Sequence, residues 1–432
     1  MCWWQHIYAA VVIKSFTQFT YCGAMKATGP IPAGYDCIDG ELVIGGMTAR
    51  ALVEEAGDTP LFVYSTSHLR KRMSDLRAAM PDRLAIHYAM KGNPYSPVLT
   101  LMNELVDGFD VASGGELELA LNAGVDAARV SFAGPGKRDR ELERAISLGV
   151  TLNCESEGEV ERAIAIGAKL DIRPRLAVRV NPSFDLKGSG MKMGGGAKQF
   201  GVDAERVPAL VNRILIAGAQ WQGFHIYAGS QALSADAIIA MQAQTLDLVV
   251  ELTQAIGTSP PKVNLGGGFG IPYFPGDTPV DIKAVGLALD ASLSALPKSL
   301  ADTHFCIELG RYMVGEAGVY LTRIVDRKIS HGETFLVTDG GLHHQLAASG
   351  NFGTVIRRNY PVAIANRFDA DPTEVATIVG CLCTPLDKLS DSAHLPRADV
   401  GDLVAIFCAG AYGASASPAN FLGQGPAAEL LV

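Results

Sequence analysis

The chain of 432 residues is longer than a typical single domain, and we expect two domains. Hydrophobic residues make up 48% of the sequence and charged residues 19%, so that a large apolar core can form. The formal net charge is −9, with acidic and basic residues mixed along the chain and no basic tract. This distribution argues against a nucleic acid as partner.

The N-terminal residues 1–25 differ in character from the rest of the chain. Their apolar run, 7–13, is shorter than the ~20 residues that a membrane span takes, which leaves a signal peptide or a disordered extension. We expect the disordered extension, with Met25 as the functional start and no membrane association. The eight cysteines show no metal-ligand spacing, which predicts no metal site and a reducing, cytoplasmic environment.

From residue 60 onward, short apolar runs alternate with stretches rich in Ala, Leu and Glu, a pattern that predicts alternating strands and helices. The runs predicted as strands are 84–91, 108–113, 129–133, 151–155, 175–181, 222–228, 262–265 and 305–308. The helices predicted between them include 115–123, 139–148, 157–166 and 235–256. Such alternation over about 250 residues predicts an α/β fold, a (β/α)8 barrel spanning 59–312.

Beyond residue 315 the pattern changes to β-like runs separated by Gly, Pro and Asp. These runs are 318–325, 333–338, 375–379 and 402–408, and the upstream run 38–44 has the same character. We therefore predict a second, mostly β domain built from 26–58 and 313–432. No low-complexity linker separates it from the barrel, and we expect the two to pack closely.

In a (β/α)8 barrel, functional groups gather at the C-terminal ends of the strands. The chain places its unusual residues at such ends: Lys91, 113–116, 179–182, 225–231, 266–268 and 308–311. Several of them at one barrel mouth predict a polar site. A Lys-, Met- and Gly-rich stretch, 187–199, is predicted to be a mobile loop over that mouth.

Taken singly, these residues leave alternatives open. Lys91 is either a solvated lysine or an amine that bonds covalently to a carbonyl group. Glu308 is either a solvated carboxylate or a partner that keeps a pyridine nitrogen protonated. The glycines 266–270 either form a tight turn or offer backbone N–H groups to an oxyanion.

Taken together, ten segments carry a resemblance. They are HYAMKGN, DVASGGEL, FAGPGK, RVNP, the K-x-F-G element at 198–201, GSQ, NLGGGFG, ELGR, the Cys383 segment ending at Asp387, and GAYG. In order and spacing the chain resembles, over roughly residues 38–432, the fold-type III pyridoxal-phosphate-dependent decarboxylases, the diaminopimelate and ornithine decarboxylase group. The resemblance implies a barrel of the alanine racemase type, a β-sandwich or β-barrel second domain, and pyridoxal 5'-phosphate as cofactor.

The resemblance also implies roles for single residues. Lys91 is expected to bond covalently to the cofactor, and Glu308 to pair with its pyridine nitrogen. Tyr227 takes the place of the family's ring-stacking histidine, and His225 is kept beside it. Cys383 is expected to reach the active site of a second subunit and to protonate the product, which implies a homodimer with shared sites. The groups expected around the phosphate are Ser230, Gly267, Gly268, Gly310, Arg311 and Tyr412.

Two departures from the family bear on the substrate. The acid that follows the family's cysteine, which would bind a distal ammonium, is here Thr384, which cannot offset a buried positive charge. The family segment RPxLY is replaced by 357–361, whose two arginines suit an anionic tail. The residues expected to line the substrate site are Arg311, Arg357, Tyr360, Thr384 and Tyr412.

The sequence thus predicts decarboxylation at Cα of an amino acid without a distal ammonium. Such a substrate is acidic, of glutamyl type or tethered to a carrier protein, as for the divergent decarboxylases of biosynthetic gene clusters. One alternative is a diaminopimelate decarboxylase of lysine biosynthesis, against which Thr384 argues. A racemase would place an arginine where Glu308 stands. A non-catalytic pyridoxal-phosphate-binding protein would need neither Cys383 nor a second domain.

Overall fold

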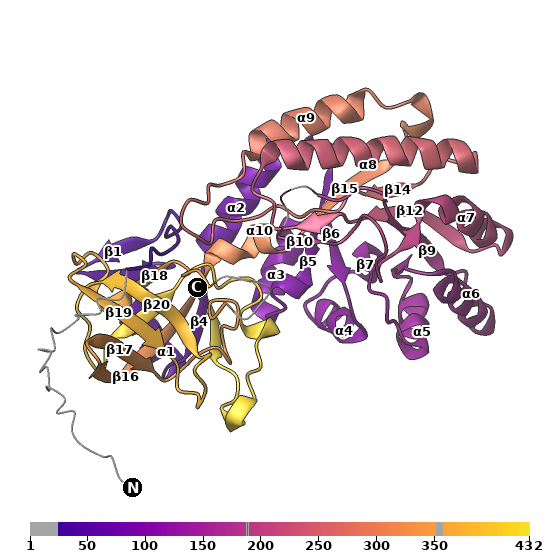
Figure 1. Ribbon diagram of the computed structural model, residues 1–432. Helices are drawn as coiled ribbons and strands as arrows, with labels where there is room; N and C mark the ends of the chain where they lie inside the picture. The colour runs from indigo at the N-terminus through magenta and orange to yellow at the C-terminus, as the bar shows by residue number, and fades with distance from the viewer. Residues whose placement is uncertain (1–24, 187, 189, 351–356) are drawn as a thin grey trace, which may run out of the picture.

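A computed structural model describes residues 25–186, 188, 190–350 and 357–432. The predicted N-terminal extension lies outside these residues, apart from Met25. Two bodies lie side by side: a barrel ringed by helices, and a smaller, mostly β part that combines the first and last segments of the chain (Figure 1). None of the helices in the described residues combines the length and hydropathy that crossing a bilayer takes.

All eight predicted barrel strands are present and parallel. In chain order they are β5 (Ala85–Ala89), β6 (Gly108–Val111), β7 (Val130–Phe132), β8 (Thr151–Cys154), β9 (Arg175–Asn181), β12 (Gln220–Ile226), β14 (Lys262–Asn264) and β15 (His304–Leu309). The barrel closes because β15 pairs with β5. The short β11 (Val202–Asp203) adds to β9 from outside. The predicted (β/α)8 barrel is confirmed.

The helices cover the outside of the barrel (Figure 1). They are α2 (Thr66–Ala79), α3 (Ser96–Leu105), α4 (Gly114–Asn122), α5 (Asp139–Leu148), α6 (Glu157–Leu170), α7 (Val207–Ile216), α8 (Ala235–Ile256) and α9 (Ile282–Ser294). The short α10 (Arg311–Val314) follows β15 and lies between the barrel and the β part (Figure 1). Helices α2, α4, α6 and α8 each begin after a serine whose hydroxyl accepts an N–H from the first turn. These serines fix where each helix leaves its strand, and with it the shape of the barrel mouth.

The second body contains one eight-stranded sheet. Its strands are β4 (Leu61–Tyr64), β16 (Gly318–Ser330), β17 (Glu333–Thr338), β18 (Val362–Ile364), β19 (Glu374–Val379), β20 (Lys388–Leu395), β21 (Leu403–Ile406) and β22 (Ala428–Leu431). The first strands, β1 (Asp36–Ile38), β2 (Glu41–Ile44) and β3 (Met47–Thr48), form a small separate sheet followed by α1 (Ala49–Ala56). The predicted mostly β second domain is confirmed.

Two details differ from the expected elements. The run 38–44 is a hairpin, because Asp39 and Gly40 turn the chain with positive φ. The strand β4 falls inside the segment assigned to the barrel, yet it pairs with β16 and β22 of the other sheet. Because β4 is a fully buried apolar run, its composition cannot distinguish it from a barrel strand. The remaining domain boundaries stay predictions.

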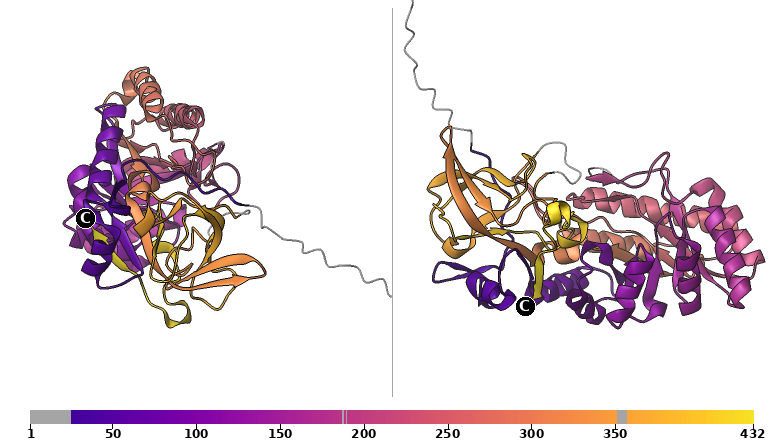
Figure 2. Two further views of the ribbon diagram at one scale, coloured as in Figure 1. Left: turned by 90° about the vertical axis from the view of Figure 1, so that its left-hand side faces the viewer. Right: turned by 90° about the horizontal axis from the view of Figure 1, so that it is seen from below.

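The two bodies share a core. One hydrophobic cluster joins barrel residues such as Phe109 to sheet residues such as Tyr320 and Ile378. A second cluster packs α1 against the other face of the sheet. Figure 2 shows how the first strands and α1 lie beside the C-terminal strand, β22. The close packing expected from the lack of a linker agrees with this arrangement.

Candidate active site

Lys91 lies just past β5, in a 3₁₀ turn formed by Met90–Gly92 at the mouth of the barrel. Its side chain is exposed there, and Nζ lies 5.5 Å from the centre of the Tyr227 ring. Desolvation acts to lower the pKa of Lys91, but Tyr227, Tyr412 and Glu308 outweigh it and raise the pKa above its ordinary value. Lys91 therefore lies beside an aromatic ring and within the electrostatic influence of a carboxylate.

Glu308 lies at the end of β15, inside the barrel mouth. Its Oε2 accepts a hydrogen bond of 2.8 Å from the amide of Asn264 and lies 3.0 Å from Nε2 of His225. Burial acts to raise the pKa of the Glu308 carboxyl, but His225 and Lys91 outweigh it and hold the pKa below its ordinary value. The carboxylate is therefore buried and ionised, as the predicted role beside a pyridine nitrogen requires.

Arg311 begins α10, directly after β15. Its Nη1 donates to the hydroxyl of Tyr273 at 2.8 Å, and its Cζ lies 4.7 Å from the centre of the Tyr412 ring. The backbone N–H of Tyr412 donates to the carbonyl of Gly92, next to Lys91. Arg311 and Tyr412, predicted from distant parts of the sequence, thus meet beside the lysine turn.

The glycines after β14 line the same mouth. A Cβ on Gly267 would lie 1.9 Å from the carbonyl oxygen of Glu308, and one on Gly268 would lie 2.2 Å from that of Gly229. Gly268 also has a φ of 89°, which disfavours other residues. Packing alone therefore requires these glycines, and their predicted contact with a phosphate remains a prediction. Gly310 approaches the carbonyl oxygen of Ala89 in the same way.

Ser230 lies in β13 (Gly229–Ser230), which pairs with β10 (Met191–Lys192). Its hydroxyl contacts the hydroxyl of Tyr227 and acts to lower the pKa of that tyrosine, although burial raises the pKa overall. The segment predicted to be a loop over the mouth, 187–199, is thus tied to the barrel through β10. Residues 187 and 189 lie outside the described part of the chain.

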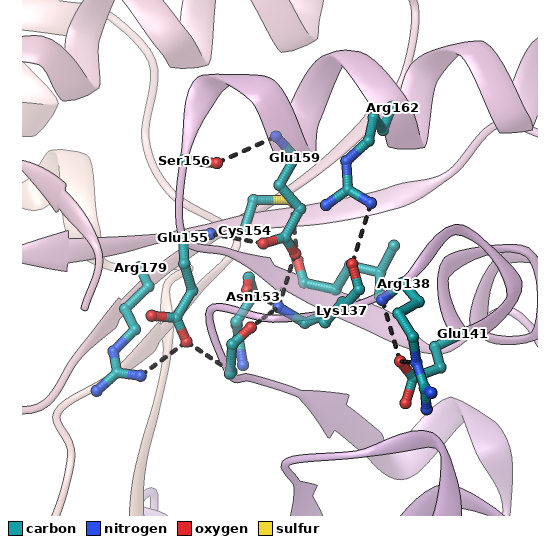
Figure 3. A network of polar contacts seen from close by, with 12 residues as sticks. Lys137, Arg138, Glu141, Asn153, Cys154, Glu155, Ser156, Glu159, Arg162 and Arg179 are labelled. Carbon is teal, nitrogen blue, oxygen red and sulfur yellow. Dashed lines mark hydrogen bonds and ion pairs between the residues drawn. The ribbon is translucent and has the colours of Figure 1, made fainter. Parts of the chain in front are cut away.

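A buried charge network lies beside the mouth, at the ends of β7, β8 and β9 (Figure 3). Arg179 of β9 donates to Glu155 at 2.8 Å, and its guanidinium lies 4.8 Å from the ring centre of Phe200. Glu155 also accepts from the backbone N–H of Gly201 at 3.2 Å. Glu155 therefore fixes both Arg179 and the end of the mouth segment. Arg179 also contributes to the pKa shift of Glu308, to which it is electrostatically close.

The residues at the mouth fit pyridoxal phosphate in charge and in hydrogen bonding. A buried carboxylate, a lysine and an arginine meet there with glycine backbone. Among the residues that the structure describes, Nε of Arg311 and Nδ1 of His225 are buried without a hydrogen-bond partner. Buried polar atoms normally have partners, so these atoms are sites that a polar ligand would complete.

Cys383 and Thr384 lie away from this set, in the turn between β19 and β20. The thiol of Cys383 is exposed, and no hydrogen bond joins it to Lys91 in the described chain. The hydroxyl of Thr384 accepts the N–H of Leu386 at 3.4 Å, within the turn itself. The Asp387 carboxylate stabilises the turn by accepting hydrogen bonds from the backbone N–H groups of Leu342 and Leu382.

The two remaining substrate candidates are engaged by other residues of the fold, Arg357 away from the mouth and Tyr360 beside Arg311 and Tyr273. Arg357 donates from Nη2 to the carbonyl oxygens of Ser349, Leu386 and Lys388, and so clamps the Cys383 turn. Tyr360 is buried, 4.7 Å from the ring centre of Tyr273. The Arg357 guanidinium is occupied by these carbonyl oxygens, so that its binding of a substrate carboxylate stays a prediction.

Sequence reasoning did not assign Tyr273, Asn264 or Glu155. Tyr273 lies in an irregular segment after β14, where no periodicity marks it. Asn264 and Glu155 are polar residues at strand ends, the same pattern that predicted Glu308 as a site residue, and could have been assigned from it. In the structure Asn264 donates a hydrogen bond to Glu308, and Glu155 accepts one from Arg179.

The family model for the pyridoxal-binding domain of pyridoxal-dependent decarboxylases matches residues 66–315. The chain belongs to this family. Its relatives include an L-glutamyl-(BtrI acyl-carrier protein) decarboxylase of Niallia circulans, 36% identical over 380 residues that cover 87% of this chain and 89% of the relative. A diaminopimelate decarboxylase of Methanothermobacter thermautotrophicus is 32% identical over 408 residues, 91% of each protein.

Solved structures of such decarboxylases share the whole fold. The diaminopimelate decarboxylase of M. jannaschii in complex with L-lysine aligns with a TM-score of 0.84 at 26% identity and covers 93% of each chain. This decarboxylase therefore has the barrel and the β domain of its relatives, and pyridoxal phosphate is its cofactor.

Proposed function

We propose that this decarboxylase acts on a glutamyl group tethered to a carrier protein, removing the carboxylate at Cα. The observation that carries the proposal is Thr384, which stands where the resemblance expects an acid for a distal ammonium. A glutamyl group joined to a carrier through its side-chain carboxyl has no such ammonium. The relative named as an L-glutamyl-carrier decarboxylase supports this choice.

The chain's own groups account for the reaction. Lys91, Glu308 and Arg311, with Ser230 and the glycines 266–268, would hold the cofactor. When bound, pyridoxal phosphate accepts the electron pair that remains at Cα after CO2 leaves. Glu308, kept ionised by His225 and Lys91, would hold a proton on the pyridine nitrogen. Asn264 from β14 and His225 from β12 orient that carboxylate.

Cys383 supplies the proton that Cα needs after CO2 has left. Because its exposed thiol makes no contact with Lys91 in the described chain, we propose that it serves the site of a second subunit. The working protein is then a homodimer whose sites each combine two chains, in the cytoplasm. Arg357 contributes by holding the turn that carries Cys383.

The competing function is that of a diaminopimelate decarboxylase. Several relatives named diaminopimelate decarboxylases are 29–32% identical to this chain, such as the one from Aquifex aeolicus at 32%. A buried distal ammonium would require an acidic partner, since burying an unpaired charge is costly. Thr384, whose hydroxyl is already part of the turn, does not supply one.

The rate of CO2 release from different substrates distinguishes the glutamyl-carrier decarboxylase from the diaminopimelate decarboxylase. The cofactor-loaded protein would be given a glutamyl-carrier thioester, free glutamate or meso-diaminopimelate at equal concentration. We expect turnover of the tethered glutamyl group and little of the diamino acid. Faster turnover of meso-diaminopimelate would contradict the proposal.

Two variants sharpen the comparison. Thr384→Asp restores a carboxylate at the position and should raise the relative rate on meso-diaminopimelate about tenfold, the effect of one charged hydrogen bond. Thr384→Val keeps the shape without charge and should not change the preference. Equal effects of the two variants would show that Thr384 does not select the substrate.

A further inference from the structure

A cavity of about 260 Å³ lies between the lysine turn and the C-terminal strand, β22. None of the residues assigned to the active site lines it, although Gly92 and Asn93 directly follow Lys91. The polar and aromatic groups of its wall are Tyr64, Asn93, Tyr95, Ser96, Ser415 and Glu429. The cavity is therefore a separate space that shares one backbone turn with the catalytic lysine.

Glu429 gives the cavity a negative charge. Its Oε2 accepts a hydrogen bond of 2.6 Å from the hydroxyl of Tyr64, and the Tyr95 hydroxyl donates to its backbone carbonyl at 2.8 Å. Burial raises the pKa of Glu429, and within the described ranges no lysine, arginine or histidine acts on it. Glu429 is partly buried, and its one side-chain partner, Tyr64, is neutral, so that a cation bound in the cavity would supply the missing counter-charge.

The two tyrosines shape the space beside the carboxylate. Their ring centres lie 5.7 Å apart, with the ring planes inclined by 44°. Aromatic faces attract cations, and the strength of this attraction grows as the cation is desolvated. The other lining residues are small or apolar, among them Pro94, Ala414 and Ala427. The volume lies below the range typical of drug-sized ligands, so the cavity suits a short molecule.

We propose that this cavity binds a primary alkylammonium ion, with Glu429 as its counter-charge and Tyr64 and Tyr95 as its walls. This is the chemical class that any decarboxylation of an amino acid releases, so the ligand does not depend on which substrate the enzyme prefers. The carbonyl of Gly92 accepts the N–H of Tyr412 at 2.8 Å. A ligand in the cavity therefore contacts the backbone that connects Lys91 to Tyr412.

The test is calorimetric titration of the cofactor-loaded protein with propylammonium chloride. Sodium chloride and 1-propanol serve as controls for ionic strength and for the apolar chain. We expect saturable binding of propylammonium, none of 1-propanol, and no change in the visible absorption of the cofactor. Glu429→Gln keeps the shape and should weaken binding at least about tenfold, as loss of one charged interaction implies.

The matched control is Glu251→Gln, which changes an exposed glutamate on α8 and should leave binding unchanged. Both variants should keep the thermal midpoint and the cofactor absorption of the parent protein. Undetectable binding, or equally tight binding to Glu429→Gln, would overturn the proposal. A shift of the cofactor absorption at the same midpoint would also overturn it, because the amine would then be at Lys91.

Discussion

At the scale of single residues, the turn between β19 and β20 offers a matched pair of cysteines. Cys381 and Cys383 are both exposed thiols two residues apart. If Cys383 protonates Cα, Cys383→Ala should lower the rate of CO2 release about a hundredfold, the usual contribution of a general acid. Cys381→Ala should stay within twofold of the parent.

The measurement is steady-state CO2 release, with the visible absorption of the cofactor recorded for each variant. Both variants should keep that absorption, since neither thiol contacts Lys91 in the described chain. Equal rates for the two variants would remove Cys383 from the mechanism. A loss of cofactor absorption in Cys383→Ala would instead assign it a role in binding.

The charged residues of the barrel mouth were predictable from the sequence because they lie at the ends of predicted strands. Glu308 and Arg311 follow an apolar run, and a barrel brings all such positions to one end. The groups that orient them were not predictable in the same way. Tyr273 meets Arg311 only because an irregular segment folds back over the mouth, and sequence spacing carries no signal for that contact.

At the scale of elements, a buried ion pair connects the loop after β7 to α6. Lys137 donates to Glu159 at 2.6 Å and to the carbonyls of Gly134 and Asn153 (Figure 3). Both charged side chains are almost fully buried, at 1% and 2% exposure. Removing one partner leaves the other charge buried and unpaired, which typically costs about 3–5 kcal/mol.

We therefore expect Lys137→Met to lower the free energy of unfolding by about 3–5 kcal/mol. The double variant Lys137→Met with Glu159→Met replaces the pair by apolar groups of similar length, and should recover most of that loss. Denaturant unfolding of the three proteins measures the difference. A double variant less stable than Lys137→Met would show that the pair itself, and not the unpaired charge, controls stability.

The elements were the best predicted part of the fold. Each barrel strand is a short run of buried apolar residues, and such a run predicts a strand whichever strands it pairs with. The strand β4 has the same apolar composition, yet it pairs with β16 in the other sheet, and β16 lies more than 250 residues further along the chain. Long-range pairing decides which sheet a buried strand joins, and the local composition of the strand does not predict that pairing.

At the scale of the whole molecule, the proposed mechanism needs two chains. The mouth of one barrel holds Lys91, Glu308 and Arg311, while Cys383 faces outward from the β domain without contact to them in the described chain. A two-fold arrangement would place each β domain at the other chain's barrel. The turn that carries Cys383 is fixed by two contacts: Arg357 donates to the carbonyl oxygens of Leu386 and Lys388, and Asp387 accepts the N–H of Leu382.

Complementation between two inactive variants tests this arrangement. Lys91→Ala and Cys383→Ala should each be nearly inactive alone. In a mixed dimer, one of the two sites combines an intact Lys91 with an intact Cys383 from the other chain. Random pairing makes half of the dimers mixed, so co-expression should restore roughly a quarter of the parent activity.

The control places both changes in one chain. When that double variant is co-expressed with the parent chain, neither site of a mixed dimer has both residues, because Cys383 is lost from one and Lys91 from the other. Only dimers of two parent chains should then be active, again roughly a quarter of the total. If each site used the Cys383 of its own chain, mixed dimers would keep one intact site and activity would rise to roughly half. Co-expression of the single variants would then restore nothing.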